Sequence, residues 1–81
     1  MTILIVDDHP IVLKGIHALM ASSFAEARIM DAAGLKEAEQ MLNRHKVDIL
    51  ITDLDLNGES GSMLIEHVRD VQPATQVVVY T

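Results

Sequence analysis

Acidic side chains follow two short apolar segments of this sequence. Asp7 and Asp8 come directly after residues 3–6 (ILIV), and Asp53 comes directly after residues 47–52 (VDILIT). If these segments are neighbouring parallel strands, their carboxyl ends meet at one edge of a sheet and the three carboxylates converge. Two such charges about 4 Å apart repel by roughly 4 kcal/mol at an effective dielectric constant of about 20. The group is therefore expected to take up a proton or to bind a cation.

Oxygen donors of this kind suit Mg²⁺, which binds carboxylates and keeps positions open for water and phosphate. An aspartate beside hydrated Mg²⁺ is a nucleophile toward a phosphoryl group, because the metal neutralises the negative charge that develops. Thr81 ends a further apolar segment, residues 77–80, and its hydroxyl would hydrogen-bond a phosphoryl oxygen. The pattern favours phosphoryl transfer to an aspartate.

Alternating strands and helices are predicted to position these side chains. Short β-branched segments alternate with segments of helical apolar spacing, which favours an α/β fold with a parallel sheet and helices on both faces. Residues 53–61 are rich in Asp, Asn and Gly and are expected to form a loop. His9 is expected only to start the first helix. The expected strands are 3–6, 27–31, 47–52 and 77–80, and the expected helices are 10–23, 35–45 and 62–71.

Composition and charge exclude several classes of protein. The chain has 81 residues, of which 49% are hydrophobic, so it is one small globular domain and not a disordered acidic tail. It has no cysteine, which excludes disulfide scaffolds and thiolate metal sites. Six scattered basic residues against twelve acidic ones give a net charge of −6, which opposes direct binding of nucleic acid. No segment approaches the ~20 apolar residues of a membrane span, and no basic region of a signal peptide is present, so we expect a cytoplasmic protein.

Three motifs in register carry a family resemblance. Residues 3–10 (ILIVDDHP), residues 53–61 (DLDLNGESG) and the apolar strand ending at Thr81 resemble the receiver domain of bacterial two-component response regulators. The opening is most similar to the subfamily with a C-terminal helix-turn-helix output domain. The resemblance covers the whole chain and implies a flavodoxin-like, doubly wound parallel sheet with strand order 2-1-3-4. It also implies a phosphoprotein of a phosphorelay that regulates transcription, with a sensor histidine kinase as partner and DNA contacted only through an output domain.

By the same resemblance, each site residue receives a role. Asp53 would be the phosphoacceptor, and Thr81 would be the switch hydroxyl that follows the phosphoryl group. Asp7, Asp8 and Asp53 would hold Mg²⁺, with the backbone carbonyl of Asp55 as a further ligand. Such a domain catalyses its own phosphorylation and dephosphorylation but serves as a switch, so it is not expected to be a turnover enzyme.

The chain departs from the family pattern at two places. Asn57 stands four residues after the predicted phosphoacceptor, where the family usually has proline. A fifth strand ending in lysine and two last helices have no counterpart, so residues 1–81 are expected to form one truncated receiver-like domain. The fourth strand is then left with an open edge. A non-catalytic interaction fragment, such as a homodimer formed through this edge or by strand exchange, is therefore an alternative.

Two further alternatives come from motifs around Asp53. Residues 53–58 match the start of an EF-hand calcium loop, but Leu64 stands at the twelfth position, where that loop requires glutamate. Residues 49–55 resemble the nucleophile motif of haloacid-dehalogenase-type phosphatases. That family gives no role to the acidic pair after the first strand and needs a downstream lysine that is absent.

Overall fold

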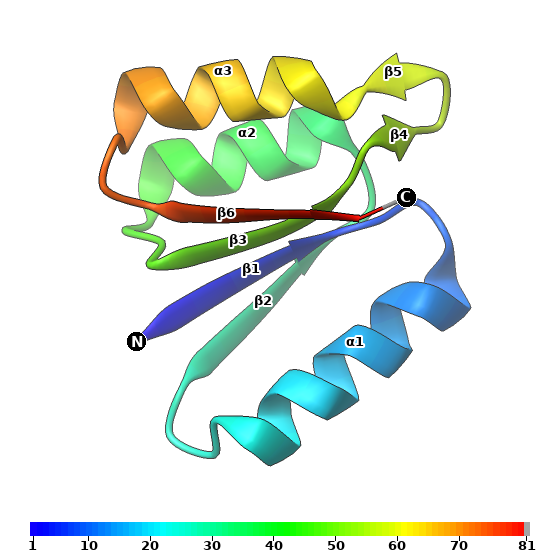
Figure 1. Cartoon of the computed structure of the whole chain (residues 1–81), viewed down its shortest axis with the longest axis vertical. Helices are drawn as coiled ribbons and strands as arrows, with labels where there is room; N and C mark the ends of the chain where they lie inside the picture. Colours follow the sequence, from blue (N-terminus) through cyan, green and yellow to red (C-terminus); the bar gives the residue numbers. More distant parts are fainter. Residues whose placement is uncertain (81) are drawn as a thin grey trace.

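A four-stranded parallel sheet forms the centre of the molecule (Figure 1). The computed structural model describes residues 1–80, so Thr81, the predicted switch residue, lies outside the described residues. The strands are β1 (Thr2–Val6), β2 (Arg28–Ala32), β3 (Ile49–Asp53) and β6 (Gln76–Tyr80), and they take the order β2-β1-β3-β6. The predicted fold class and the strand order 2-1-3-4 are confirmed.

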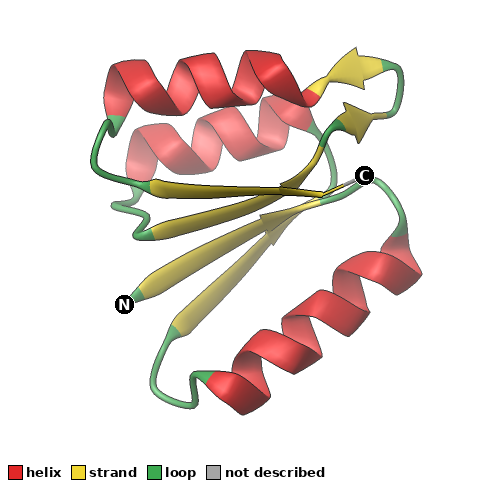
Figure 2. Cartoon of the chain, in the orientation of Figure 1, coloured by secondary structure: helices red, strands yellow, loops and turns green. Residues whose placement is uncertain are grey.

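Helices cover both faces of this sheet, as Figure 2 shows. The helix α1 (Pro10–Ser23) lies on one face, and α2 (Leu35–Arg44) and α3 (Gly61–Val71) lie side by side on the other. All three lie close to their predicted positions. Within residues 1–80, none of them has the length and apolar character needed to cross a membrane.

The register of the sheet explains why its strands end together. β1 lies between β2 and β3, and its four apolar residues from Ile3 to Val6 are inaccessible to solvent. A continuous apolar run suits a strand covered on both faces. Val6 pairs with Ala32 on one side and with Thr52 on the other. The residues that follow β1 and β3 therefore lie at the same edge of the sheet.

The main core lies between the sheet and the layer formed by α2 and α3. Successive strand residues point to opposite faces, so alternate residues of β1 and β3 meet the apolar faces of these two helices. Leu56, in the segment after β3, is also fully buried in this core. The core consists of Leu4, Val6, Ala32, Leu35, Ala38, Leu42, Val47, Leu50, Leu56, Leu64 and Val68.

The opposite face is covered less completely. α1 contains no buried residue, although its sequence carries apolar residues at helical spacing, and Ile11 is 87% exposed. β6 is the end strand of the sheet, and its Val78 and Val79 are 50% and 42% exposed. Within residues 1–80, apolar surface on α1 and β6 is therefore left open to solvent.

The expectation of a plain loop over residues 53–61 is wrong in one respect. The strands β4 (Asp55–Leu56) and β5 (Glu59–Ser60) pair as an antiparallel hairpin, joined by Asn57 and Gly58. These two turn residues have φ angles of 55° and 85°. Positive φ at both central residues is what a two-residue type I′ turn requires, and Asn-Gly is the dipeptide that favours it most. Strands of two residues are too short to give a periodic apolar pattern, so the sequence did not reveal them.

We expect Asn57→Pro to destabilise the protein, although proline is usual at this position of the family. Proline fixes φ near −65°, which is incompatible with the positive φ of Asn57. The free energy of unfolding should fall by about 1–3 kcal/mol in urea denaturation. Asn57→Gly is the matched control, since glycine adopts positive φ freely, and it should change stability by only a few tenths of a kcal/mol. A proline variant as stable as the wild type would contradict the hairpin.

Candidate functional site

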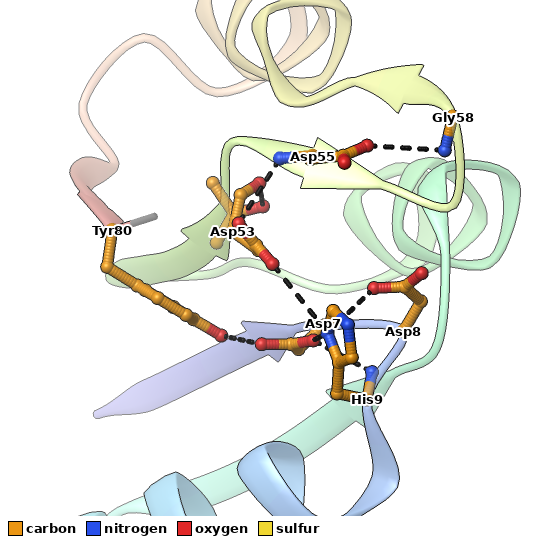
Figure 3. Close-up of polar contacts among 8 residues, drawn as sticks. Asp7, Asp8, His9, Asp53, Asp55, Gly58 and Tyr80 are labelled. Carbon is orange, nitrogen blue, oxygen red and sulfur yellow. Dashed lines mark hydrogen bonds and ion pairs between the residues drawn. The ribbon is translucent and has the colours of Figure 1, made fainter.

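Three carboxylates from two strand ends meet at the carboxyl edge of the sheet (Figure 3). Asp7 follows β1 and is 1% exposed, and Asp53 ends β3 and is 9% exposed. Asp8 is partly exposed. The predicted convergence of Asp7, Asp8 and Asp53 is observed, because one carboxylate oxygen of each lies within 4.8 Å of the others.

His9 is the first site residue whose role the sequence analysis missed. Its Nδ1 lies 2.7 Å from Asp7 Oδ1, 3.1 Å from Asp8 Oδ1 and 3.8 Å from Asp53 Oδ2. His9 is the N-cap of α1, as expected, but its side chain makes no capping hydrogen bond. Its backbone N–H instead donates to Asp7 Oδ1 over 2.8 Å. The imidazole is therefore turned toward the carboxylates, a direction that position in the sequence alone does not reveal.

Tyr80 is the second missed residue, and strand register accounts for its position. Its hydroxyl donates a hydrogen bond of 2.5 Å to Asp7 Oδ2. Tyr80 is the register partner of Asp53, and Asp7 follows Val6, the partner of Thr52. Asp7, Asp53 and Tyr80 thus form one row across three strands. The sequence analysis predicted strand order but no register, and the register of β3 with β6 is the signal that places Tyr80 beside Asp53.

These contacts shift the pKa values of three groups. Burial raises the pKa of Asp7, but hydrogen bonds from Tyr80 and His9 outweigh it and hold the pKa below its usual value. The pKa of His9 is raised, first by its hydrogen bond to Asp7 and then by the charge of Asp8. The pKa of Tyr80 is raised by burial and by its bond to Asp7. The ionised form of Asp7 and the protonated form of Tyr80 are therefore the stable pair.

The backbone around Asp53 holds its carboxylate toward this cluster. Asp53 Oδ1 accepts a hydrogen bond of 3.2 Å from the N–H of Asp55. The Leu54 N–H donates to the Tyr80 carbonyl over 3.0 Å, and the Leu54 carbonyl accepts from the Gly61 N–H over 2.6 Å. The segment after β3 is thereby fixed to β6 on one side and to the start of α3 on the other.

Asp55 is placed differently from the other acids. Its exposed carboxylate turns toward the hairpin and accepts a hydrogen bond of 3.2 Å from the Gly58 N–H (Figure 3). The role of its backbone carbonyl as a metal ligand stays a prediction, as does the role of Thr81. The EF-hand alternative is contradicted, because the segment before Asp53 is a strand of the central sheet and an EF-hand requires a helix there.

The charge and hydrogen bonding of the cluster suit a divalent cation. Asp8 Oδ1 is buried and has no hydrogen-bond partner, since His9 Nδ1 lies near it without the alignment of a hydrogen bond. Every ion pair within residues 1–80 involves a histidine, so no lysine or arginine of this part neutralises the three carboxylates. Hard oxygen donors with an unsatisfied buried lone pair match the ligands that Mg²⁺ takes in proteins. The residues present therefore fit this ion.

The protein is thus an α/β domain with a doubly wound parallel sheet, and an acidic pocket that suits a divalent cation lies at the carboxyl edge of this sheet. The family model described as "Response regulator receiver domain" matches residues 3–81 of the chain. The chain belongs to the response regulator receiver domain family.

Known proteins similar to this chain include response regulators and transcriptional regulatory proteins. It is 31% identical over 78 residues to the glycerol metabolism activator of Pseudomonas putida, a match that covers 95% of this chain and 35% of that protein. A response regulator from Burkholderia pseudomallei, solved with a phosphorylated aspartic acid, calcium ion and citrate, is 25% identical with a TM-score of 0.83. That match covers 99% of this chain and 48% of the other. The response regulator TrrA from Thermotoga maritima, in complex with Mg(2+)-BeF, supports the fold alone, at 22% identity and a TM-score of 0.86 over 96% of this chain and 66% of the other.

The match to longer proteins is partial. The chain spans little more than a third of the length of the first curated relatives that it matches. The comparisons therefore identify the receiver domain, and the activities of the whole relatives concern a much longer chain.

We expect Gly61→Ala to disturb the segment that holds Asp53. A Cβ atom at Gly61 would lie 2.6 Å from the Asp53 carbonyl oxygen and 3.0 Å from Leu54 Cα, both backbone atoms. The free energy of unfolding should fall by about 1–3 kcal/mol in urea denaturation. Gly15→Ala is the control, because nothing lies within 4 Å of its Cβ position. It should raise stability by about 0.5–1 kcal/mol, since alanine favours a helix. Equal stability of Gly61→Ala and wild type would count against the close approach.

We expect Tyr80→Phe to raise the pKa of Asp7, because one of the bonds that lower it is lost. A lowered native pKa contributes stability above the unfolded value, and this contribution is lost as the pH falls through the native pKa. Removing the hydroxyl should therefore leave less stability to lose on acidification. A ¹³C NMR titration of the Asp7 carboxyl measures the pKa, and backbone amide shifts of β1 and β3 control for the fold. An unchanged pKa of Asp7 in Tyr80→Phe would show that the hydrogen bond from Tyr80 does not lower this pKa.

Proposed function

We propose that this chain is the phosphoacceptor module of a two-component response regulator, in which Asp53 receives a phosphoryl group from a sensor histidine kinase. The observation that supports the proposal is the convergence of Asp53 with Asp7 and Asp8 in one pocket at the sheet edge. Asp53 is nine-tenths buried yet retains some exposure, so a phosphodonor can reach it. Family membership supports the same assignment.

The reaction is a displacement at phosphorus. Asp53 Oδ2, which accepts no hydrogen bond within residues 1–80, attacks the phosphoryl group of a phosphohistidine, an O–P bond forms and the P–N bond breaks. The electron pair of the broken bond returns to the departing imidazole. Asp7, Asp8, Asp53 and the Asp55 carbonyl would hold Mg²⁺, which neutralises negative charge on the phosphoryl oxygens when it is bound. Thr81 would hydrogen-bond the transferred group.

The output of this module is a signal and not a released product. The phosphorylated and free forms would bias a two-state surface, so we propose a switch and not a turnover enzyme. A cytoplasmic location and regulation of transcription are proposed by analogy with the similar regulators. DNA contact would then come from an output domain, because the net charge of −6 on this chain repels phosphates.

A second candidate function, self-association, is favoured by the end strand of the sheet. β6 carries no charged side chain, and its Val78 and Val79 are half-exposed. An uncharged, unpaired strand edge is a template for pairing with another chain. A homodimer formed through β6 would involve the exposed Val78 and Val79, whereas Tyr80, at the end of the same strand, contacts the acidic pocket.

The phosphoacceptor proposal predicts one phosphoryl group on wild-type protein after incubation with acetyl phosphate and Mg²⁺, measured by intact mass spectrometry. Asp53→Asn should take up none, because an amide oxygen is a poor nucleophile. Asp70→Asn is the matched control, since Asp70 is exposed near the end of α3 and has no role in the pocket, and it should be phosphorylated like wild type. Phosphorylation of Asp53→Asn would overturn the assignment, and rapid release of phosphate from varied monoesters would favour the phosphatase alternative.

Self-association predicts a concentration-dependent dimer in sedimentation velocity. Val78→Lys should shift the population to monomer, because a charged side chain on an edge strand opposes pairing. Ile11→Lys is the control, as it replaces a more exposed apolar side chain on α1, and it should leave the dimer unchanged. A wild-type chain that is monomeric at all concentrations would refute this candidate.

A further inference from the structure

His9 is the feature of the pocket that the proposed function leaves unused. Its backbone is fixed at the start of α1, because its N–H donates to Asp7 Oδ1 and its carbonyl accepts from the Leu13 N–H over 2.9 Å. Its side chain takes no part in capping the helix. Figure 3 shows the imidazole lying between the carboxylates of Asp7, Asp8 and Asp53.

The spacing of these atoms is close to that of donors around one ion. An ion with ligands at about 2.1 Å holds neighbouring donors about 3.0 Å apart and opposite donors about 4.2 Å apart in octahedral geometry. His9 Nδ1 lies 2.7, 3.1 and 3.8 Å from one oxygen each of Asp7, Asp8 and Asp53. All four donor atoms lie within 4.8 Å of one another. A small outward movement of the ring would therefore complete a four-donor cradle.

Two oxygens of the cradle accept no hydrogen bond within residues 1–80, which points to a ligand beyond the cluster's own hydrogen bonds. Asp8 Oδ1 is buried without a hydrogen bond. Asp53 is nine-tenths buried, and within residues 1–80 no hydrogen bond reaches its Oδ2, which faces His9. The hydrogen bond from His9 to Asp7 thus satisfies only one of the three carboxylates.

We propose that His9 Nδ1 is a fourth donor of this pocket and gives it a preference for divalent ions that accept imidazole nitrogen, such as Co²⁺ and Zn²⁺, over Mg²⁺. Carboxylate-only sites suit Mg²⁺ and Ca²⁺, whereas an imidazole among the ligands favours later first-row metals. The coordinating form is the neutral ring, with its proton on Nε2 and the Nδ1 lone pair on the ion. The inference rests on the proposed function only in taking the acidic pocket as a cation site.

The test is to compare binding of Co²⁺ and of Mg²⁺ by wild type and by His9→Asn. Asparagine is a favoured N-cap, so the variant keeps the start of α1 while losing the ring nitrogen. Wild type should bind Co²⁺ more tightly than Mg²⁺, with a change in the visible d–d absorption of Co²⁺. Loss of a partner outside the ligand set typically costs about 10- to 100-fold in metal affinity. Loss of the ligand itself should therefore weaken Co²⁺ at least about tenfold, while Mg²⁺ changes much less.

His67→Ala controls for Co²⁺ bound by a histidine outside the pocket, since His67 lies on α3 and contacts Asn43, and it should bind both ions like wild type. Equal affinity of His9→Asn and wild type for Co²⁺ would overturn the proposal, as would equal losses for the two ions. Tighter binding of both ions by His9→Asn would also overturn it, because His9 would then act as a plug.

The two proposals fail separately. If Asp53 is phosphorylated in Mg²⁺ but His9→Asn keeps its Co²⁺ affinity, only the role of His9 is lost. If Co²⁺ binding depends on His9 but acetyl phosphate does not modify Asp53, only the phosphoacceptor function is lost.

Discussion

The parallel register of the strands brings three carboxylates together at one edge of the sheet, and the other side chains of the site offset the repulsion between them. The row formed by Asp7, Asp53 and Tyr80 follows from pairing β1 and β6 with β3. The two strands that position the acids, β1 and β3, contain some of the most buried residues of the molecule, so the carboxylates cannot move apart without unpairing the sheet. Their repulsion must be offset locally, and only two side chains within residues 1–80 do so: the phenol of Tyr80 and the imidazole of His9.

These two groups relieve the repulsion in different ways. Tyr80 is a neutral donor on Asp7, so it stabilises one ionised carboxylate without supplying charge. His9 supplies charge only when it is protonated, and its raised pKa reflects the acids around it. Neither group donates a hydrogen bond to Asp8 Oδ1, which is buried. An arrangement with this much uncompensated negative charge is more stable with a cation than without one, which connects the register of the sheet to the metal chemistry proposed for the site.

The sequence predicted the parts of the fold that depend on continuous or periodic apolar residues. β1 and β3 are apolar runs, and α2 and α3 have one apolar stripe each. The acidic pair follows β1 and Asp53 ends β3, so strand order and acid cluster could be predicted together. The β4–β5 hairpin was missed because its signal is two turn residues with positive φ, not a period. His9 and Tyr80 were missed because a side chain's direction depends on backbone geometry and register, which residue type does not fix. The apolar residues of α1 at helical spacing include no buried one. Their spacing predicts which face of the helix is apolar, but it does not predict what covers that face.

Tyr80 is held in place by pairing with β3 alone, because β6 is the end strand of the described sheet, and this pairing is enough to place its hydroxyl at Asp7. β6 is the outermost strand and is half-exposed, yet five register pairs join it to β3, and the Leu54 N–H donates to the Tyr80 carbonyl. The Leu54 carbonyl accepts a hydrogen bond from the Gly61 N–H, so the end of β6 and the start of α3 are both bonded to Leu54, the residue after Asp53. Gly61 is required there because any side chain would enter the space of the Asp53 carbonyl. Backbone contacts from β6 and α3 thus fix the segment after β3, whose Asp55 N–H bonds the Asp53 carboxylate, and the chemistry of its free oxygen depends on the geometry that the sheet imposes.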